Sequence, residues 1–276
     1  MPETLGLPEA VHRHVQDGSR VYIGNFGVQL FCVGHELIRQ GRRDLHAVIG
    51  SGGLLLDQLI GAKALASATF SHCWSPLGPT PAFNFRRLAE SGDTSVELHE
   101  LSLGLFNAAL MAGAYGVPFM PVADLAGAGY IDEDWTGGRT SWVDSAFGGT
   151  RVISAEVPDV AFVHVDLADA DGNGVIRGPL GEVALAAQAA RSVVLVAEQL
   201  VPNEEVRRAG VSIPGVLVDA VVELPGAARP DGAIGRYDRD VAGYERYSAK
   251  SRTPEGFADW LRDDVMAGVP SIEEKA

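Results

Sequence analysis

Short runs of apolar residues alternate along the chain with longer stretches in which apolar residues recur at helical spacing. The short runs predict strands at residues 21–24, 45–49, 67–70, 95–98, 160–165, 193–197 and 215–223. The longer stretches predict helices at residues 30–39, 54–65, 83–89, 102–114, 182–190 and 255–265, the last capped by Thr253. Neighbouring parallel strands need crossover connections, so this alternation predicts an α/β fold with an open, mostly parallel sheet and helices on both faces.

Two segments depart from this rhythm. Residues 101–123 carry no charge, but their glycines and prolines favour a buried helix followed by a buried strand over a membrane span. Residues 124–150 are rich in glycine and hold Trp135 and Trp142, which favours a long irregular loop or a small hairpin. We therefore expect a single domain over residues 1–276 with a glycine-rich insertion at about residues 124–150.

The composition limits the partners of such a domain. The chain has 276 residues, 46% of them hydrophobic, which is enough apolar surface for a packed core. Its 22 basic and 36 acidic residues give a net charge of −14, so nucleic acid and anionic membranes are poor partners. Two cysteines, Cys32 and Cys73, and a start without a secretory leader favour a reducing cytoplasm.

Two metal-site motifs begin in this sequence and are then broken. His35-Glu36 starts like a helical zinc-protease motif, but Arg39 stands where the second histidine is required. Residues 169–174 match the first half of a calcium loop, but the twelfth position is Leu180, which offers no carboxylate. A tight turn explains residues 169–174 better, and we predict no metal site.

Two glycine-rich loops each follow a predicted strand and open a predicted helix. They are Gly24-Asn25-Phe26-Gly27 and Gly50-Ser51-Gly52-Gly53. Parallel strands end at one edge of the sheet, and ligands of open α/β sheets usually bind there. Free backbone N–H groups at such loops suit an anion or a closely approaching ligand. Tight turns explain the glycines equally well, so both interpretations stay open.

The segment Glu97-Leu98-His99-Glu100 closes a predicted strand at the same edge. A glutamate in a partly desolvated cleft can act as a nucleophile toward a thioester or as a base toward water. Glu97 and Glu100 are therefore candidate catalytic residues, although two acids and an imidazole also suit a solvated strand end. No Gly-x-Ser-x-Gly motif is present, and the adjacency of His72 and Cys73 does not by itself make a nucleophile–base pair.

Five segments follow one another in a recognisable order. They are residues 84–90 (NFRRLAE), 96–100 (VELHE), 116–121 (GVPFMP), 158–173 (beginning PDVAFVH and ending ADADGN) and 225–240 (beginning PGAARP and ending YDRD). From about residue 18 to residue 261 the chain thereby resembles the A (alpha) subunit of family I CoA-transferases, in particular the glutaconate CoA-transferase branch. Ala227-Ala228-Arg229 stands for the usual Gly-Ala-His, and Leu98-His99 for a more typical Tyr-Ser. These departures bear on the acyl substrate more than on the fold.

The resemblance implies a partner and a reaction. The partner is a B (beta) subunit of similar fold, in a hetero-oligomer such as α2β2, with the active site between the two chains. In typical members a glutamate of the second chain attacks the acyl-CoA thioester, giving an acyl-glutamyl anhydride and then a glutamyl-CoA thioester. CoA is thus a substrate, and no permanently bound cofactor is implied. By this analogy the acyl group, a dicarboxylate or another carboxylated acid, is expected to contact Gly24, Phe26, Gly27, Gly52, Gly53, Ser71, His72 and Ser75.

Two other functions remain open at this point. A related branch, the IpdA-like steroid ring-cleaving hydrolases, uses a glutamate that matches Glu100, which would then activate water. A regulator that binds a ligand without turnover would share the same architecture. CoA phosphates are anionic and the chain is acidic, so we expect cationic contacts from the partner or from Arg86 and Arg87.

Overall fold

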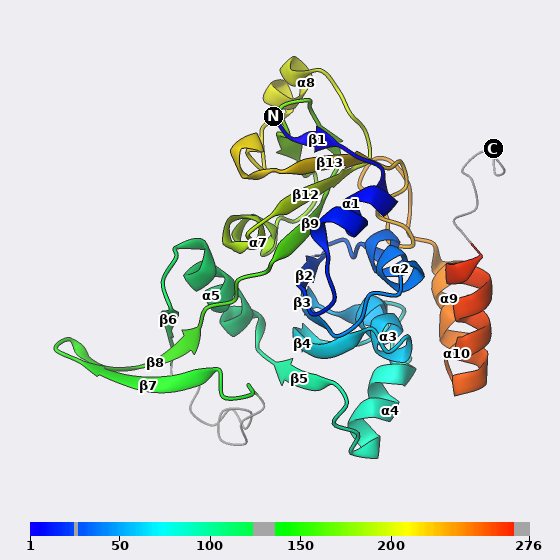
Figure 1. Ribbon diagram of the computed structural model, residues 1–276, viewed down its shortest axis with the longest axis horizontal. Coiled ribbons are helices and arrows are strands. Elements are labelled where there is room, and N and C mark those ends of the chain that lie inside the picture. Colours follow the sequence, from blue (N-terminus) through cyan, green and yellow to red (C-terminus); the bar gives the residue numbers. More distant parts are fainter. Residues whose placement is uncertain (25–26, 124–135, 268–276) are drawn as a thin grey trace.

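The computed structural model describes residues 1–24, 27–123 and 136–267. Its centre is a sheet of eight strands in which every neighbouring pair runs parallel (Figure 1). This confirms the predicted α/β fold. From edge to edge the strands are β1 (Glu3–Thr4), β13 (Ala220–Glu223), β12 (Val193–Ala197), β9 (Val160–Val165), β2 (Arg20–Ile23), β3 (Leu45–Ser51), β4 (Leu65–His72) and β5 (Glu97–Glu100).

The strand order reverses in the middle of the sheet. From β2 the chain builds outward through β3, β4 and β5, and it then returns to place β9 on the other side of β2. From β9 it builds outward in the opposite direction through β12 and β13. The connections that leave the carboxyl ends of β2 and β9 therefore diverge, and the crevice between such connections is the usual ligand site of open α/β sheets.

Helices cover both faces of the sheet. Three of them begin with a side-chain cap, in which Ser102, Asp240 and Thr253 accept hydrogen bonds from backbone amides of the first turn. One face carries α1 (Leu7–His14), α2 (Phe31–Arg39), α3 (Gly53–Gly61), α4 (Phe83–Ser91), α9 (Val241–Lys250) and α10 (Pro254–Trp260), which continues as η2 (Leu261–Met266). The other face carries α5 (Leu103–Ala114) and α7 (Val183–Ala189). Between the later strands lie β10 (Leu167–Ala168), β11 (Gly174–Val175), α8 (Asn203–Ala209) and η1 (Gly215–Leu217).

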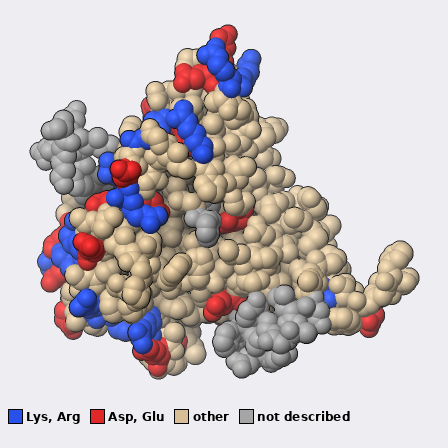
Figure 2. Space-filling view, turned by 180° about the vertical axis from the view of Figure 1, so that it is seen from behind, with Lys and Arg blue, Asp and Glu red and all other residues tan. Residues whose placement is uncertain are grey.

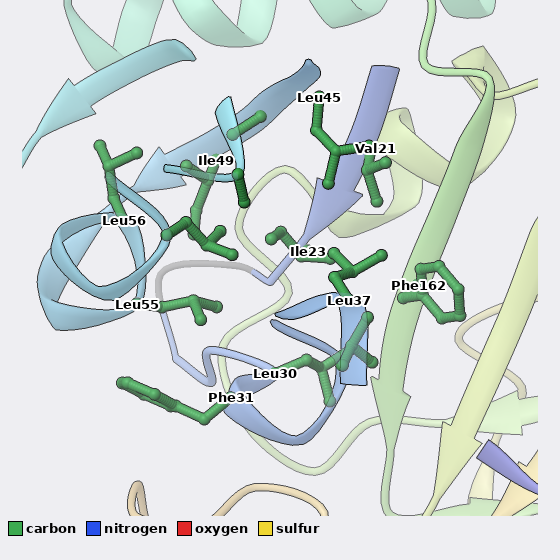
Figure 3. Packing of buried hydrophobic residues seen from close by; sticks show 14 of the residues in the cluster. Val21, Ile23, Leu30, Phe31, Leu37, Leu45, Ile49, Leu55, Leu56 and Phe162 are labelled. Carbon is green, nitrogen blue, oxygen red and sulfur yellow. The ribbon is translucent and has the colours of Figure 1, made fainter. Parts of the chain in front are cut away.

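The strand residues divide between two apolar cores because successive side chains point to opposite faces of a sheet. Val21, Ile23 and Phe162 pack with Leu30 and Leu37 of the α2 side, as Figure 3 shows. The intervening residues of the same strands pack against α5 and α7. Since both faces are covered, β9 and β12 are buried along their whole length, which explains why β12 is wholly apolar and β9 is apolar except for His164.

An antiparallel arm extends from the body (Figure 1). It consists of β6 (Phe119–Val122), β7 (Thr140–Ser145) and β8 (Gly148–Ser154). Trp142 is 53% exposed, and Phe147, in the turn at the tip, is fully exposed. The hairpin of β7 and β8 runs from Thr140 to Ser154, beyond the expected end at about residue 150, whereas residues 124–135, with Trp135, lie outside the described residues.

A buried carboxylate fixes the base of the arm to the sheet. Glu156 follows β8, and its side chain is only 2% exposed. It accepts hydrogen bonds from Arg20 at 3.1 Å and from Arg139 at 2.5 Å. Arg139 also donates to the Thr69 hydroxyl of β4, so one ion-pair cluster joins the arm to two strands of the sheet.

We expect Glu156→Gln to lower the free energy of unfolding by about 2 kcal/mol, because it leaves two guanidinium groups without their anion. Urea denaturation measures this loss. Glu90→Gln is the matched control, since Glu90 makes an exposed ion pair with Arg86 and its loss should cost less than about 1 kcal/mol. Equal losses in the two variants would contradict a special role for the buried cluster.

Several predicted boundaries are wrong for identifiable reasons. The helix predicted at residues 54–65 ends at Gly61, because Leu65 already begins β4. The strand predicted at residues 215–223 starts only at Ala220, after the 3-10 turn η1. The strand predicted as buried after α5 is β6, whose residues alternate between exposed and half-buried because it belongs to the arm. No helix in the described ranges is long and apolar enough to span a bilayer.

Candidate functional site

The carboxyl edge of the sheet brings together most of the residues expected at the site. Gly24 follows β2, Gly52 follows β3, and Ser71 and His72 end β4. Glu100 ends β5, which pairs with β4 through Phe70 and Glu100. Parallel pairing explains this gathering, since all of these strands end on the same side.

The two glycine-rich loops are joined by Gln29, a residue that the sequence analysis did not single out. Its Nε2 donates to the Ser51 carbonyl at 2.9 Å, and its Oε1 accepts from the Leu55 amide at 3.3 Å. Gly24 (φ +113°) and Gly53 (φ +49°) both lie against Gln29, and a Cβ at Gly53 would clash with its side-chain amide. Close packing around Gln29 therefore explains these glycines, and the first turn of α3 already has a polar partner.

A serine–histidine pair lies at the ends of β3 and β4. Ser51 Oγ is 2.8 Å from His72 Nε2. The rings of His72 and Trp74 pack in a T-shaped arrangement with their centroids 5.7 Å apart. Burial lowers the pKa of His72, so its imidazole is neutral at pH 7. Depending on the tautomer, Nε2 of a neutral His72 either donates to the Ser51 hydroxyl or accepts from it. Either hydrogen bond holds the hydroxyl in a position to meet a ligand. The register that pairs Ser51 with His72 depends on a β-bulge at Leu45, which sequence alone does not reveal.

The two serines predicted near the end of β4 differ in their surroundings. Ser75 is buried and accepts a hydrogen bond from the Leu77 amide at 3.3 Å, so it shapes the loop. The Ser71 hydroxyl is buried and has no hydrogen-bond partner among the described residues. A buried hydroxyl without a partner is costly, which makes Ser71 the better candidate for a ligand contact.

The two candidate acids of β5 are separated by the pleat of the strand. Glu97 is 71% exposed and lies 3.7 Å from His99 on one side. Glu100 points to the other side, and its partial burial raises its pKa. A carboxylate whose pKa is raised by desolvation is a stronger base, so Glu100 can act as a general base. Glu100 is therefore the stronger candidate of the two.

A second buried acid, Glu198, follows β12 at the same edge and was not predicted. It accepts hydrogen bonds from His164 at 3.1 Å, from the hydroxyl of Tyr237, and from the amides of Gly226 and Ala228. Burial opposes its ionisation, but these four donors outweigh burial and lower the pKa of Glu198 to about 2. The carboxylate thus fastens the 226–237 segment to the sheet. Its position directly after a predicted strand is the signal that could have identified it.

Other residues predicted for the site lie away from this edge or outside the described residues. Arg86 makes an exposed ion pair with Glu90 on α4. Arg87 donates to the Ser251 and Arg252 carbonyls and thereby holds the C-terminal helices. Phe26 lies outside the described residues. Asp169 accepts amide hydrogen bonds inside a tight turn, as expected, and the described residues contain no group of three metal-ligating side chains.

Comparison with known proteins identifies the family of this chain. A family model described as Coenzyme A transferase matches residues 5–224. The chain belongs to this family. The A subunit of the 3-oxoadipate CoA-transferase from Pseudomonas knackmussii is 31% identical over 99% of this chain and 97% of its own length.

Two further proteins similar to this chain are named for different reactions. The glutaconate CoA-transferase structure from Acidaminococcus fermentans superposes with a TM-score of 0.88 at 26% identity, covering 96% of this chain and 89% of that one. The cholesterol ring-cleaving hydrolase IpdA subunit from Rhodococcus jostii is 26% identical over 98% of this chain and 97% of its own length. The chain is thus similar over nearly its whole length both to a transferase subunit and to a hydrolase subunit.

Proposed function

We propose that this chain is the alpha-type half of a heteromeric CoA-transferase that moves CoA between an acyl-CoA thioester and a carboxylic acid. The observation that carries the proposal is the similarity to the 3-oxoadipate CoA-transferase chain over almost the full length of both proteins. The carboxyl edge described above supports it, because a serine hydroxyl held by a histidine, an acid with a raised pKa and close-packed turns suit a small acyl group.

In this proposal the chain forms one wall of the site. The family resemblance assigns the nucleophilic glutamate to a B-type companion. On this chain, the Ser51 hydroxyl, held by His72, would donate to an acyl or thioester oxygen. A donor aimed at a developing oxyanion is typically worth about 3 kcal/mol of barrier. Glu100, half-buried at the end of β5, would contact the substrate beside this donor.

The distribution of charge supports a companion chain. In Figure 2 charged side chains gather over α8 at the top and over the side that holds α9 and α10, whereas the middle of that face and the arm carry few. Low charge density is typical of the core of protein interfaces. The proposal places the protein in the reducing cytoplasm, because Cys32 and Cys73 are free thiols.

A hydrolase is the second candidate function. The raised pKa of Glu100 favours it, since a general base works best with a pKa closer to neutrality than that of a free glutamate. In that case Glu100 would activate a water molecule, and no CoA-bound glutamate would form on a companion chain.

Reconstitution with a B-type companion tests the proposal. We expect no CoA transfer by this chain alone and transfer from acyl-CoA to a carboxylate by the pair. Borohydride trapping and mass spectrometry should then locate a glutamyl-CoA thioester on the companion. Full turnover by the isolated chain, or a pair that binds no acyl-CoA, would refute it. Ligand-stabilised folding without any turnover would indicate a regulator instead.

A further inference from the structure

The side chain of Gln29 bridges the two glycine-rich loops at the carboxyl edge of the sheet. Its Nε2 donates to the Ser51 carbonyl at 2.9 Å, and its Oε1 accepts from the Leu55 amide at 3.3 Å. Both ends of this side-chain amide are thus bonded to the backbone of the connection between β3 and α3. An amide does not ionise near neutral pH, so Gln29 is suited to holding this connection and not to acid–base chemistry.

The peptide group between Ser51 and Gly52 is held at both of its polar atoms. Its carbonyl accepts from Gln29 Nε2, and its N–H donates to the His72 carbonyl at 3.0 Å. Two opposed hydrogen bonds fix the plane of a peptide group, and this plane limits the directions that the Ser51 side chain can take. The Ser51 hydroxyl lies 2.8 Å from His72 Nε2 in this arrangement. The placement of the hydroxyl therefore depends on a contact made by Gln29.

The backbone around Ser51 needs such a restraint. Ser51 lies between Gly50 and Gly52, and Gly53 follows with a φ of +49°. Glycine has more accessible backbone conformations than any other residue, so this segment would sample several directions of the hydroxyl if it were not held. A misplacement of about 1 Å at a reacting group can cost about a hundredfold in rate. The hydrogen bond to the Ser51 carbonyl can thus affect turnover more than it affects stability.

Gln29 is itself fixed by a buried acid from the C-terminal part of the chain. Asp231 is buried, and its Oδ2 accepts from the Gln29 backbone amide at 3.0 Å. Its Oδ1 accepts from the Tyr244 hydroxyl at 2.7 Å, and Arg239 Nε lies 3.5 Å from the same oxygen. The Gln29 backbone also forms a β-bridge with Gly24. The side chain therefore extends from a firmly held backbone, as a positioning residue requires.

We infer that Gln29 is a positioning residue of the acyl site, which acts on catalysis through the Ser51 hydroxyl. The inference rests on the proposed CoA-transferase function and adds to it a residue that aligns the donor without reacting itself. Gln29→Met removes both side-chain hydrogen bonds at a similar side-chain length. We expect it to lower kcat of the reconstituted pair about tenfold and to change KM less than about twofold, because an oxyanion donor acts mainly in the transition state.

A double-mutant cycle separates this role from a general structural one. Ser51→Ala alone should lower kcat about a hundredfold. Adding Gln29→Met to Ser51→Ala should then lower kcat less than about twofold further, since the hydroxyl to be positioned is gone. A tenfold further loss would overturn the inference, because Gln29 would then act independently of the hydroxyl. Gln40→Met is the matched control and should leave kcat unchanged, since Gln40 donates to Pro8 and Glu36 at the other end of α2.

Gln29→Glu gives a second measurement that remains informative if Gln29→Met folds poorly. A protonated carboxyl at this position can donate to the Ser51 carbonyl, whereas an ionised carboxyl has no donor and repels that oxygen. Desolvation favours the protonated form, so the ratio of kcat in this variant to kcat in wild type should rise about fivefold as the pH falls from about 8 to about 5.5. His72, Asp231 and Glu100 are present in both proteins, so their titration cancels in the ratio. A ratio that stays constant with pH would overturn the inference.

CoA transfer by the wild-type pair distinguishes a failure of this inference from a failure of the proposed function. A wild-type pair that transfers no CoA would overturn the proposed function and the role of Gln29 with it. An active wild-type pair in which Gln29→Met causes no loss, or a loss that is additive with that of Ser51→Ala, would overturn the role of Gln29 alone.

Discussion

Glu198→Gln is expected to lower the free energy of unfolding by about 3 kcal/mol, the largest loss of stability from a single polar change that the structure indicates. Glu198 Oε1 accepts from His164, Tyr237 and the Ala228 amide, and Oε2 accepts from the Gly226 amide. A glutamine side chain must direct its NH₂ group at one of these donors. Urea denaturation at pH 7 measures the loss. Glu223→Gln is the matched control, since Glu223 is exposed at the end of the neighbouring strand β13 and accepts one hydrogen bond.

Wild type and Glu198→Gln, compared as the pH is varied, also test the contribution of the Glu198 charge. Its folded pKa of about 2 lies below the unfolded value of about 4.3, so its stabilising contribution is complete above the unfolded pKa and is lost as pH falls toward 2. The stability difference between wild type and Glu198→Gln should therefore shrink between pH 4.5 and pH 2. A difference that stays constant over this range would mean that the carboxylate charge contributes nothing.

Glu100→Ala is expected to have the largest effect on activity, lowering kcat/KM of the reconstituted transferase ten- to a hundredfold. The reason is the loss of one hydrogen bond to the substrate in a partly buried pocket, worth about 1–3 kcal/mol. CoA transfer should remain measurable because the proposed nucleophile belongs to the companion. Initial rates with acyl-CoA and with the carboxylate acceptor, each varied separately, give the two constants.

A matched variant separates this outcome from the hydrolase. Glu97→Ala removes the exposed acid on the other side of the same strand, and we expect rates within twofold of wild type. A loss of more than about a thousandfold in Glu100→Ala alone, together with hydrolysis by the wild type, would identify Glu100 as the general base. That result would favour the second candidate function over the transferase.

The central strands of the sheet could be predicted from sequence because they are buried on both faces and are rich in apolar residues. β9 and β12 were predicted with their observed bounds for this reason. The two-residue edge strand β1 and the helices α1, α8 and α9 were missed. α8 has a single buried residue, Val206, so little apolar periodicity marks it.

From the sequence, only those candidate residues that lie at the ends of predicted strands could be singled out. Glu100 and the glycine loops were singled out because each lies at the end of a predicted strand. The contacts of Gln29 and the pairing of Ser51 with His72 depend on which strands are neighbours and on their register, and neither is written in local sequence. Glu198 has a strand-end position like that of Glu100, but its four donors come from distant residues. Tertiary structure alone distinguishes a carboxylate that fastens a loop from one that can meet a ligand.

The arm offers a position for a spectroscopic reporter. Phe147 is fully exposed in the turn between β7 and β8, and the base of the arm is fixed by Glu156. Exposed loop tips tolerate substitution, and both native cysteines are half-buried with raised thiol pKa values, which makes them slow to alkylate. A cysteine in place of Phe147 would therefore take up a maleimide dye selectively. The emission of that dye would register the arrival of another polypeptide at the arm in real time.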